Sequence, residues 1–371
     1  MRADIAIVGG GVVGLSLAYG LRRLGRAVLV LDGGDGDFRA SRGNFGLIWV
    51  QGKGVGAPHY ARWTRRAAAM APDFAAELAE ATGIDLALRQ PGGFDYFTDE
   101  AALAAQVTAM EGLRAELGGD YPFEVVGPNA LRREMPEIGP KVVGAILGHE
   151  DGHMNPLRLL RALAQGVRHG GGRVETGVRV TSIAPLAGGG FALALADGRE
   201  AAAEKVVLAA GLGAAELGPQ LGFKAQVRPQ RGQVLITERL APFITRPSAT
   251  IRQVDEGGVQ IGASHEEVGL DDRETVAATA ALARHAVEVF PLLARARLVR
   301  SWGALRILTP DGLPIYHRSE THPGAYLVTC HSGITLAAVH ARLLPLWIEG
   351  AEGAPDLEEF SERRFAIQTA A

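Results

Sequence analysis

The first 32 residues alternate between apolar runs and turn residues in the order strand, turn, helix, strand. Residues 5–8 form an apolar run long enough for a buried parallel strand, and three glycines follow it. Gly25 ends the helix that is predicted next, and residues 27–31 form a second apolar run that ends at Asp32. The helix is predicted from apolar residues at helical spacing, namely Val13, Leu17, Leu21 and Leu24.

The rest of the chain contains two kinds of strand pattern. Continuous apolar runs near residues 5, 206 and 326 are typical of buried parallel strands, whereas the alternating segments between them are typical of antiparallel strands. The pattern therefore predicts the α/β class, with a Rossmann-like nucleotide-binding domain in three separated pieces and an inserted α+β domain on a mixed, largely antiparallel sheet. Strands are predicted at residues 174–183, 191–195, 206–210, 227–237, 259–262 and 326–329, and helices at 62–82, 155–170, 276–290 and 335–348.

Composition excludes several classes of function. The 371 residues include 38 basic and 41 acidic ones, and no block of like charge suggests a nucleic-acid partner. The single cysteine, Cys330, cannot form an internal disulfide or hold a metal cluster, and no metal site is expected. No apolar stretch reaches the roughly 18 residues of a membrane helix. We expect a cytoplasmic protein with at most a peripheral contact to the inner face of the membrane.

The glycine turn after the first strand carries the strongest chemical signal. Residues 9–14 (GGGVVG) fit the G-x-G-x-x-G pattern, in which glycines allow a tight turn, a close approach of pyrophosphate and close packing of the helix. The helix N-terminus presents free N–H groups to the anion. Asp32 lies 18 residues past Gly14, placed to bind a ribose diol. This favours NAD or FAD over NADP, and the position at the start of the chain favours FAD.

Five further segments resemble a known family. They are residues 39–47 (RASRGNFGL), 151–156 (DGHMNP), 206–211 (VVLAAG), 302–315 (WGALRILTPDGLPI) and 330–336 (CHSGITL). With the glycine turn, they resemble the D-amino acid oxidase, glycine oxidase and sarcosine oxidase family nearly end to end. The resemblance implies non-covalent FAD, because no histidine or cysteine stands where some members attach the flavin.

The resemblance also implies domain boundaries and cofactor contacts. The FAD-binding domain would comprise residues 1–85, 146–220 and 307–371, and the substrate-binding domain residues 86–145 and 221–306. The implied FAD contacts are Gly9, Gly11, Val12, Val13, Gly14, Asp32, Gly33, Ser41, Arg42, Asn44, Phe45, Gly46, Leu47, Val178, Gly211, Gly303, Ser332, Gly333, Ile334 and Thr335.

Two residues are expected to face the substrate. In many members the arginine at the place of Arg306 binds the substrate carboxylate, and the planar guanidinium suits that task; the alternative is an internal salt bridge. Ile307 stands where the family has proline, so the local backbone can differ. His331 stands where glycine oxidase-like members carry a second arginine, and its alternative is a packed loop histidine.

The implied reaction is oxidation of the C–N bond of a small amino acid or N-substituted amino acid, such as a D-amino acid, glycine, sarcosine, D-hydroxyproline or an opine. A hydride would pass to flavin N5, and water would hydrolyse the imine to an oxo acid and an amine. The alternatives are a FAD-dependent 2-hydroxy acid dehydrogenase, an oxidase that uses O2 directly, an NAD-dependent dehydrogenase, and a flavin subunit that serves only in assembly.

The lysines bear on the electron acceptor. Sarcosine-type oxidases place a lysine over the flavin, but none of Lys53, Lys141, Lys205 and Lys224 lies in the expected stretch, residues 259–265. This favours a dehydrogenase that passes electrons to a partner. Residues 41–54 also resemble the flavin subunits of bacterial opine, hydroxyproline and cyanide-forming glycine dehydrogenases, which work beside an iron–sulfur subunit. An iron–sulfur partner, in a hetero-oligomer, is therefore expected, and a homo-oligomer is the other option.

Overall fold

Five parallel strands form the centre of the largest sheet. In the computed structural model, which describes residues 1–34 and 40–368, the strand order is β16–β17–β11–β1–β2–β8, and only β16 in that path is antiparallel. The three apolar runs predicted as parallel strands lie side by side. The bounds are β1 Arg2–Val8, β2 Val28–Asp32, β8 Arg173–Thr176, β11 Glu200–Leu208, β16 Ile315–Arg318 and β17 Ala325–Thr329.

Alternate residues of the central strands pack into two hydrophobic clusters. Ile5 and Ile7 of β1 face a layer of helices, whereas Ala6 and Val8 face the antiparallel strands β9 and β10. These faces explain why the runs are continuously apolar. The helical layer consists of α1 Val12–Arg23, α2 Pro58–Thr82, α5 Pro156–His169, α8 Ala337–Arg342 and α9 Leu344–Glu349, and the strands on the other face are β9 Val180–Pro185 and β10 Phe191–Leu195.

Two predicted elements are wrong in detail. Residues 174–183 form two strands, because Gly177 adopts a φ of +76° that breaks the run between β8 and β9. Residues 335–348 form two short helices, because Pro345 lacks the N–H that would continue α8 into α9. The predicted α/β class is otherwise confirmed.

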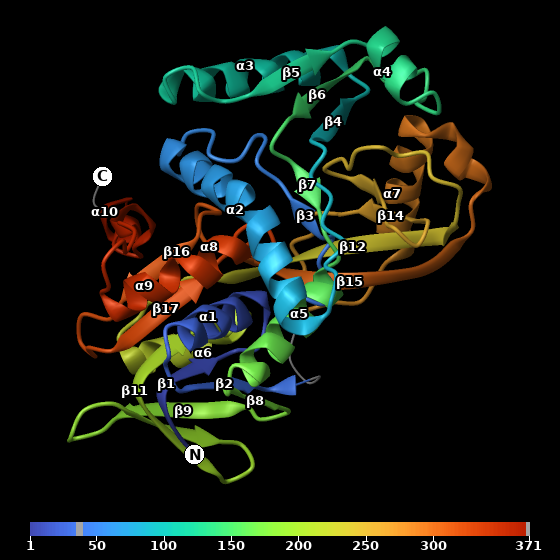
Figure 1. Ribbon diagram of the computed structural model, residues 1–371. Helices are drawn as coiled ribbons and strands as arrows, with labels where there is room; N and C mark the ends of the chain where they lie inside the picture. The colour runs from blue at the N-terminus through green and yellow to red at the C-terminus, as the bar shows by residue number, and fades with distance from the viewer. Residues whose placement is uncertain (35–39, 369–371) are drawn as a thin grey trace.

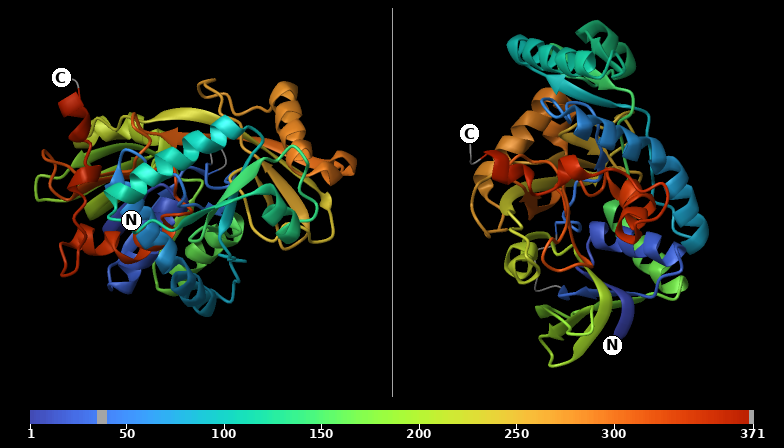
Figure 2. Two further views of the ribbon diagram at one scale, coloured as in Figure 1. Left: turned by 90° about the horizontal axis from the view of Figure 1, so that it is seen from above. Right: turned by 90° about the vertical axis from the view of Figure 1, so that its left-hand side faces the viewer.

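A second, four-stranded antiparallel sheet has the order β13–β14–β12–β15. One of its faces packs against α7. A smaller three-stranded sheet, β4–β6–β5, lies with α3 and α4 at the end of the molecule farthest from the β9–β10 hairpin (Figures 1 and 2). The elements are β12 Arg228–Arg239, β13 Ile251–Gln253, β14 Gly258–Gly262, β15 Leu298–Leu308, α7 Val276–Val289, β4 Gly93–Phe97, β5 Phe123–Val126, β6 Gly144–Gly148, α3 Glu100–Glu116 and α4 Pro128–Glu134.

Short elements join these layers. A two-stranded ladder of β3 with β7 ties the segment after Ser41 to the chain that returns from the three-stranded sheet. The domain boundaries given above stay a prediction. The short elements are β3 Leu47–Ile48, β7 Gly152–His153, η2 Gly211–Gly213, α6 Ala214–Leu217, η3 Gly218–Leu221, η4 Pro291–Arg295, η5 Glu358–Phe360 and α10 Arg364–Gln368.

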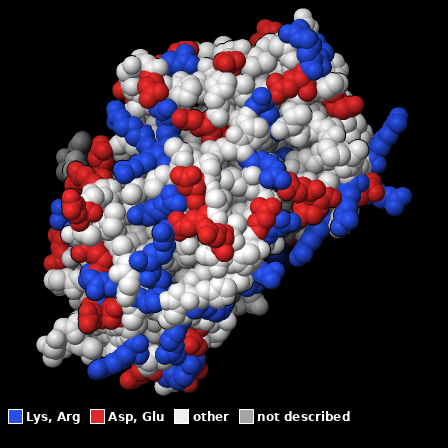
Figure 3. Space-filling model, viewed as in Figure 1, with Lys and Arg blue, Asp and Glu red and all other residues white. Residues whose placement is uncertain are grey.

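The surface carries both signs of charge. On the face shown in Figure 3, lysine and arginine side chains alternate with aspartate and glutamate, and neither sign covers a continuous area. None of the helices in residues 1–34 and 40–368 is both long and apolar enough to span a bilayer.

A buried polar chain crosses the helical layer. The indole N–H of Trp63 donates to the Tyr316 hydroxyl at 3.1 Å, and that hydroxyl lies 2.8 Å from Nε2 of His340. His340 is fully buried, its Nδ1 has no hydrogen-bond partner among the described residues, and burial lowers the pKa of its imidazole to about 3. The folded protein therefore holds His340 neutral.

This neutral histidine predicts a pH-dependent loss of stability. Between about pH 6.5 and 3 the unfolded imidazole binds a proton that the folded one does not, so the stability contribution falls as pH falls. His340→Gln keeps an acceptor for Tyr316 but does not titrate. We expect the free energy of unfolding of the wild type, relative to this variant, to be about 2 kcal/mol lower at pH 5 than at pH 7. Urea denaturation at both pH values measures it; an unchanged difference would contradict a neutral His340.

Candidate active site

The turn between β1 and α1 has room only for glycine at two positions. Gly9 has a φ of +111°, and a Cβ there would collide with the carbonyl oxygen of Ala209 on the neighbouring strand end. A Cβ on Gly14 would collide with the carbonyl oxygen of Gly9. These contacts hold the N-terminus of α1 against the ends of β1 and β11, where its positive dipole end favours an anion.

A cavity of about 630 Å³ opens at this helix end. The Asp32 carboxylate at its edge accepts hydrogen bonds from the N–H groups of Gly10 (2.7 Å) and Gly34 (3.1 Å), and the Ser41 hydroxyl accepts one from Val12 N–H (3.0 Å). Twelve residues predicted from the sequence line the cavity: Gly9, Gly11, Val12, Val13, Asp32, Gly33, Ser41, Arg42, Asn44, Gly211, His331 and Gly333.

Other predicted residues do not line this cavity. Val178 is buried, and its N–H donates to Asp32, while its neighbours Thr176, Arg179 and Val180 face the cavity. Gly303 packs against the backbone of Asp272. Also outside the lining are Gly14, Phe45, Gly46, Leu47, Arg306, Ser332, Ile334 and Thr335. Their roles as FAD contacts or substrate ligands stay predictions.

The loop before α8 is fixed by a lysine that the sequence-based prediction missed. The Lys53 ammonium donates to the hydroxyls of Ser332 (2.7 Å) and Thr335 (3.3 Å), and the Tyr60 hydroxyl also donates to Ser332 (3.0 Å). Burial lowers the pKa of Lys53 to about 8. A signal was present, because this is one of only four lysines and lies in the segment that resembles flavin subunits. The family resemblance pointed to residues 259–265 instead.

Arg306 of β15 and His331, which follows β17, lie near enough for the charge of Arg306 to act on the imidazole. Partial desolvation and the positive charges of Lys53 and Arg306 lower the pKa of His331, whose side chain lines the cavity and is exposed to it. Burial and the charge of Arg306 lower the pKa of His265 too, and His265 lies 3.0 Å from the side-chain oxygen of Gln230. Both imidazoles are therefore neutral near pH 7. His265 was not predicted from the sequence.

Arg306 lies on the face of the four-stranded sheet opposite α7. We call this the inner face; it carries Arg252, Gln260, Gly262, Gly232 and Arg306. Residues 43–46 pass across it: Trp302 of β15 donates from its indole N–H to the carbonyl of Gly43 at 3.1 Å.

The Arg306 guanidinium lacks a carboxylate partner. Its Nη1 donates to the carbonyl oxygen of Ser264 at 2.8 Å, and the guanidinium lies over Gly232, which has no side chain to obstruct it. Among residues 1–34 and 40–368, no carboxylate lies within ion-pair distance of it. Glu266 is the carboxylate whose charge acts on it, but that group is engaged elsewhere.

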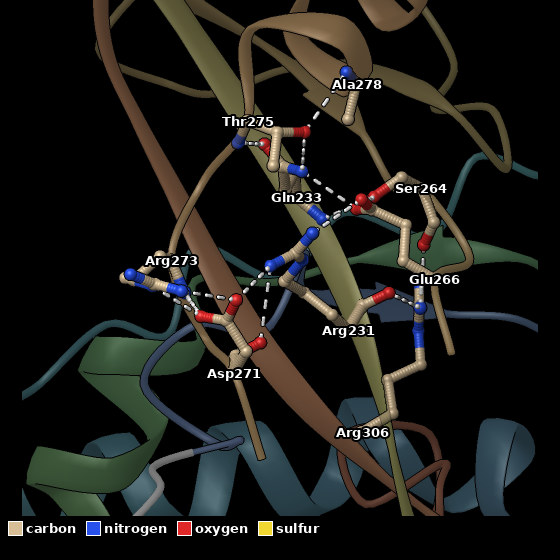
Figure 4. A network of polar contacts seen from close by, with 9 residues as sticks. All are labelled: Arg231, Gln233, Ser264, Glu266, Asp271, Arg273, Thr275, Ala278 and Arg306. Carbon is tan, nitrogen blue, oxygen red and sulfur yellow. Dashed lines mark hydrogen bonds and ion pairs between the residues drawn. The ribbon is translucent and has the colours of Figure 1, made fainter. Parts of the chain in front are cut away.

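A neighbouring arginine on the opposite face is paired (Figure 4). The side chain of Arg231 is 3% exposed and forms ion pairs with Glu266 at 2.7 Å and Asp271 at 3.5 Å. The hydrogen bond from Arg231 lowers the pKa of Glu266 to about 2. Gln233 and Ser264 also donate to Glu266. Arg231 is thus neutralised by the protein, whereas Arg306 keeps a charge available for an anion.

Cys330 lines the cavity but is not suited to attack a cofactor. Burial raises the pKa of its thiol to about 12, so the thiol stays protonated. A protonated thiol is a poor nucleophile. This favours the predicted non-covalent binding, which stays a prediction.

Comparisons with known proteins agree with this geometry. Residues 4–345 match the DAO family, described as FAD dependent oxidoreductase. The chain is 42% identical over 370 residues to an opine oxidase subunit from Rhizobium meliloti, covering 100% of this chain and 99% of that protein. It is 27% identical to hydrogen cyanide synthase subunit HcnC of Pseudomonas protegens, covering 98% and 96%. The crystal structure of glycine oxidase from Geobacillus kaustophilus superposes with a TM-score of 0.90 at 26% identity, covering 97% and 98%.

The chain belongs to the DAO family of FAD-dependent oxidoreductases, and FAD is its cofactor. The predicted resemblance is confirmed. The cavity fits FAD, because the glycines leave its floor free of side chains and the start of α1 offers a positive dipole end to a pyrophosphate.

Replacing each of the two arginines should have a different effect on stability. Arg231→Met would leave the Glu266 carboxylate without its cation and should lower the free energy of unfolding by about 3 kcal/mol. Arg306→Met removes a half-buried charge that has no carboxylate partner and should change it by less than about 1 kcal/mol. Urea denaturation compares the two. Equal losses would mean that Arg306 is a structural group.

Proposed function

We propose that this protein oxidises the C–N bond of an N-substituted amino acid of the opine type and passes the electrons to a protein partner. The observation that carries the proposal is the unpaired guanidinium of Arg306 beside two neutral imidazoles. A fixed guanidinium is the strongest neutral-pH partner for a substrate carboxylate. Glycine, D-amino acids, sarcosine and D-hydroxyproline are the other substrates to test.

The residues divide the work as follows. Arg306 binds the carboxylate in two parallel hydrogen bonds and thereby fixes the α-carbon. His331 and His265 are neutral, so they accept a hydrogen bond from the substrate amine without adding a charge that would repel it. FAD supplies the acceptor for the hydride that leaves the α-carbon. The substrate becomes an imine, and water hydrolyses that imine to an oxo acid and an amine.

Two features support a partner as electron acceptor. The stretch 259–265 contains no lysine, and Gln260 of this stretch instead accepts a hydrogen bond from Arg252. Two of the relatives are named as subunits, one of opine oxidase and one of hydrogen cyanide synthase. An iron–sulfur partner remains our proposal for the acceptor, because one cysteine cannot hold a cluster.

The substrate is tested by anaerobic bleaching of the flavin. Opines and other N-substituted amino acids should bleach the absorbance of the purified protein, and 2-hydroxy acids should not. With the best substrate, Arg306→Met should raise the Kd by about 100-fold, the effect of losing a charge-assisted hydrogen-bonded pair, while the flavin-to-protein ratio stays unchanged. Bleaching by hydroxy acids alone would refute the C–N reaction, and unchanged kinetics in the variant would remove Arg306 from the site.

The identity of the electron acceptor is tested by comparing how fast oxygen and an artificial dye reoxidise the reduced protein. Reduced protein should be reoxidised at least about tenfold more slowly by air-saturated buffer than by an artificial dye such as dichlorophenolindophenol, since no lysine from 259–265 assists the reaction with oxygen. Stopped-flow absorbance measures both rates. Hydrogen peroxide formed at the full rate of substrate oxidation would show that the protein is an oxidase.

A further inference from the structure

A second buried arginine lies on the inner face. Arg252 of β13 is 3% exposed. Its Nε donates to the side-chain oxygen of Gln260 at 2.7 Å, and its Nη1 contacts Nδ1 of His153 at 3.0 Å and the carbonyl oxygen of Met154 at 3.2 Å. All three partners are uncharged. The oxygens of Gln260 and Met154 carry no charge, and His153 is neutral because burial and the charge of Arg252 lower its pKa to about 3. The hydrogen bonds fix the guanidinium without neutralising it.

The nearest carboxylates are engaged elsewhere. Asp255 and Glu256 are the acidic groups whose charge acts on Arg252, but Asp255 pairs with Arg89 at 3.3 Å and Glu256 with Arg158 at 2.7 Å. In the part of the chain that the structure describes, no carboxylate lies within ion-pair distance of Arg252. Burial lowers the pKa of Arg252 to about 9, so it remains charged at neutral pH. A buried, unneutralised charge is costly and marks a place for an anionic ligand.

Arg252 is directed at the segment that crosses the inner face. Its guanidinium lies 5.7 Å from the ring centre of Phe45, and a Cβ on Gly46 would lie 2.7 Å from its Nη2. Nη2 itself has no hydrogen-bond acceptor among the described residues. The group therefore has a free donor edge on the same side of the sheet as Arg306.

Two glycines, Gly232 and Gly262, lie between the two arginines on the inner face. Arg306 leans from β15 over Gly232 toward Ser264, which follows β14. Gly262 lies between Ser264 and Gln260 on this strand and faces Phe45. Between its two cations the inner face therefore has no side chain of its own at Gly232 and Gly262, where Arg306 and Phe45 lie instead. A small molecule that presents one anion to each cation has to displace the Phe45 ring.

Resting on the proposed function, we propose that Arg252 binds a second carboxylate of the substrate. The preferred substrate is then a secondary amine that carries a carboxylate on each side of its nitrogen, with one carboxylate on Arg306 and the other on Arg252. An amino acid with a single carboxylate leaves Arg252 unneutralised and binds more weakly for that reason.

Two pairs of compounds of equal chain length test this assignment. Iminodiacetate and N-ethylglycine differ by one carboxylate in place of a methyl group, and anaerobic flavin reduction gives kcat/KM for each. We expect the wild type to prefer iminodiacetate by about 100-fold and Arg252→Met to lower that preference below about fivefold. Arg300→Met is the matched control. Arg300 is an exposed arginine of β15, six residues before Arg306, and therefore lies on the same face of the strand. It should keep the preference.

The second pair needs no variant. Glutarate and pentanoate have the same chain length and are not oxidised, and their Kd values for the wild type follow from shifts of the flavin spectrum. Glutarate should bind about 100-fold more tightly than pentanoate. This comparison keeps the inference testable if Arg252→Met does not fold, and Arg252→Lys, which keeps the charge but loses the planar fork, should retain part of the preference.

Three results would overturn the inference. Equal affinity for glutarate and pentanoate would show that the site holds one carboxylate only. An unchanged iminodiacetate preference in Arg252→Met would assign Arg252 a structural role. A changed flavin spectrum or reduction potential in that variant with the preference intact would place Arg252 against FAD. If no amine bleaches the flavin at all, the proposed C–N reaction fails instead, and the glutarate comparison still reports on Arg252.

Discussion

An unneutralised positive charge inside a protein has to be matched by an anion, and this constraint organises the candidate active site. Arg306 and Arg252 lie on one face of the four-stranded sheet, and the carboxylates nearest to them are bound to other arginines. The protein holds both guanidinium groups with uncharged hydrogen-bond acceptors. In the function that we propose, the site is therefore preorganised for carboxylates before the substrate binds, and this fixes the orientation of the substrate.

The opposite face of the same sheet shows the contrast. There Arg231 is paired with Glu266 and Asp271, and apolar residues pack against α7. Adjacent residues of β12 point to opposite faces because the side-chain period of a strand is two residues. One strand thus carries a structural ion pair on one side and, on the other, the face that we propose binds substrate. Arg231 and Arg306 differ in their partners, because carboxylates pair with Arg231 and backbone and amide oxygens hold Arg306.

The cofactor region depends on the absence of side chains. Gly9 and Gly14 bring the start of α1 against β1 and β11, and this places the helix N-terminus at the cavity. On the other side of the site, Lys53 ties Ser332 and Thr335 to the segment that follows β3. Both ends of the site are thus fixed by contacts between segments that are distant in the sequence, while the four-stranded sheet supplies the arginines. The pKa values of His331 and His265 are lowered because both imidazoles are partly desolvated and lie near these positive charges.

The sequence by itself determined the β–α–β start, the glycine turn, Asp32 and the family resemblance that singled out Arg306 and His331. These depend on local spacing and on short motifs, which a linear pattern contains. Only the tertiary structure showed that residues 174–183 split into two strands, and that His265, Lys53 and Arg252 approach the site. An arginine in a sequence looks the same whether a carboxylate neutralises it or not. Its partners come from distant segments, so the folded chain alone decides which charges remain for a ligand.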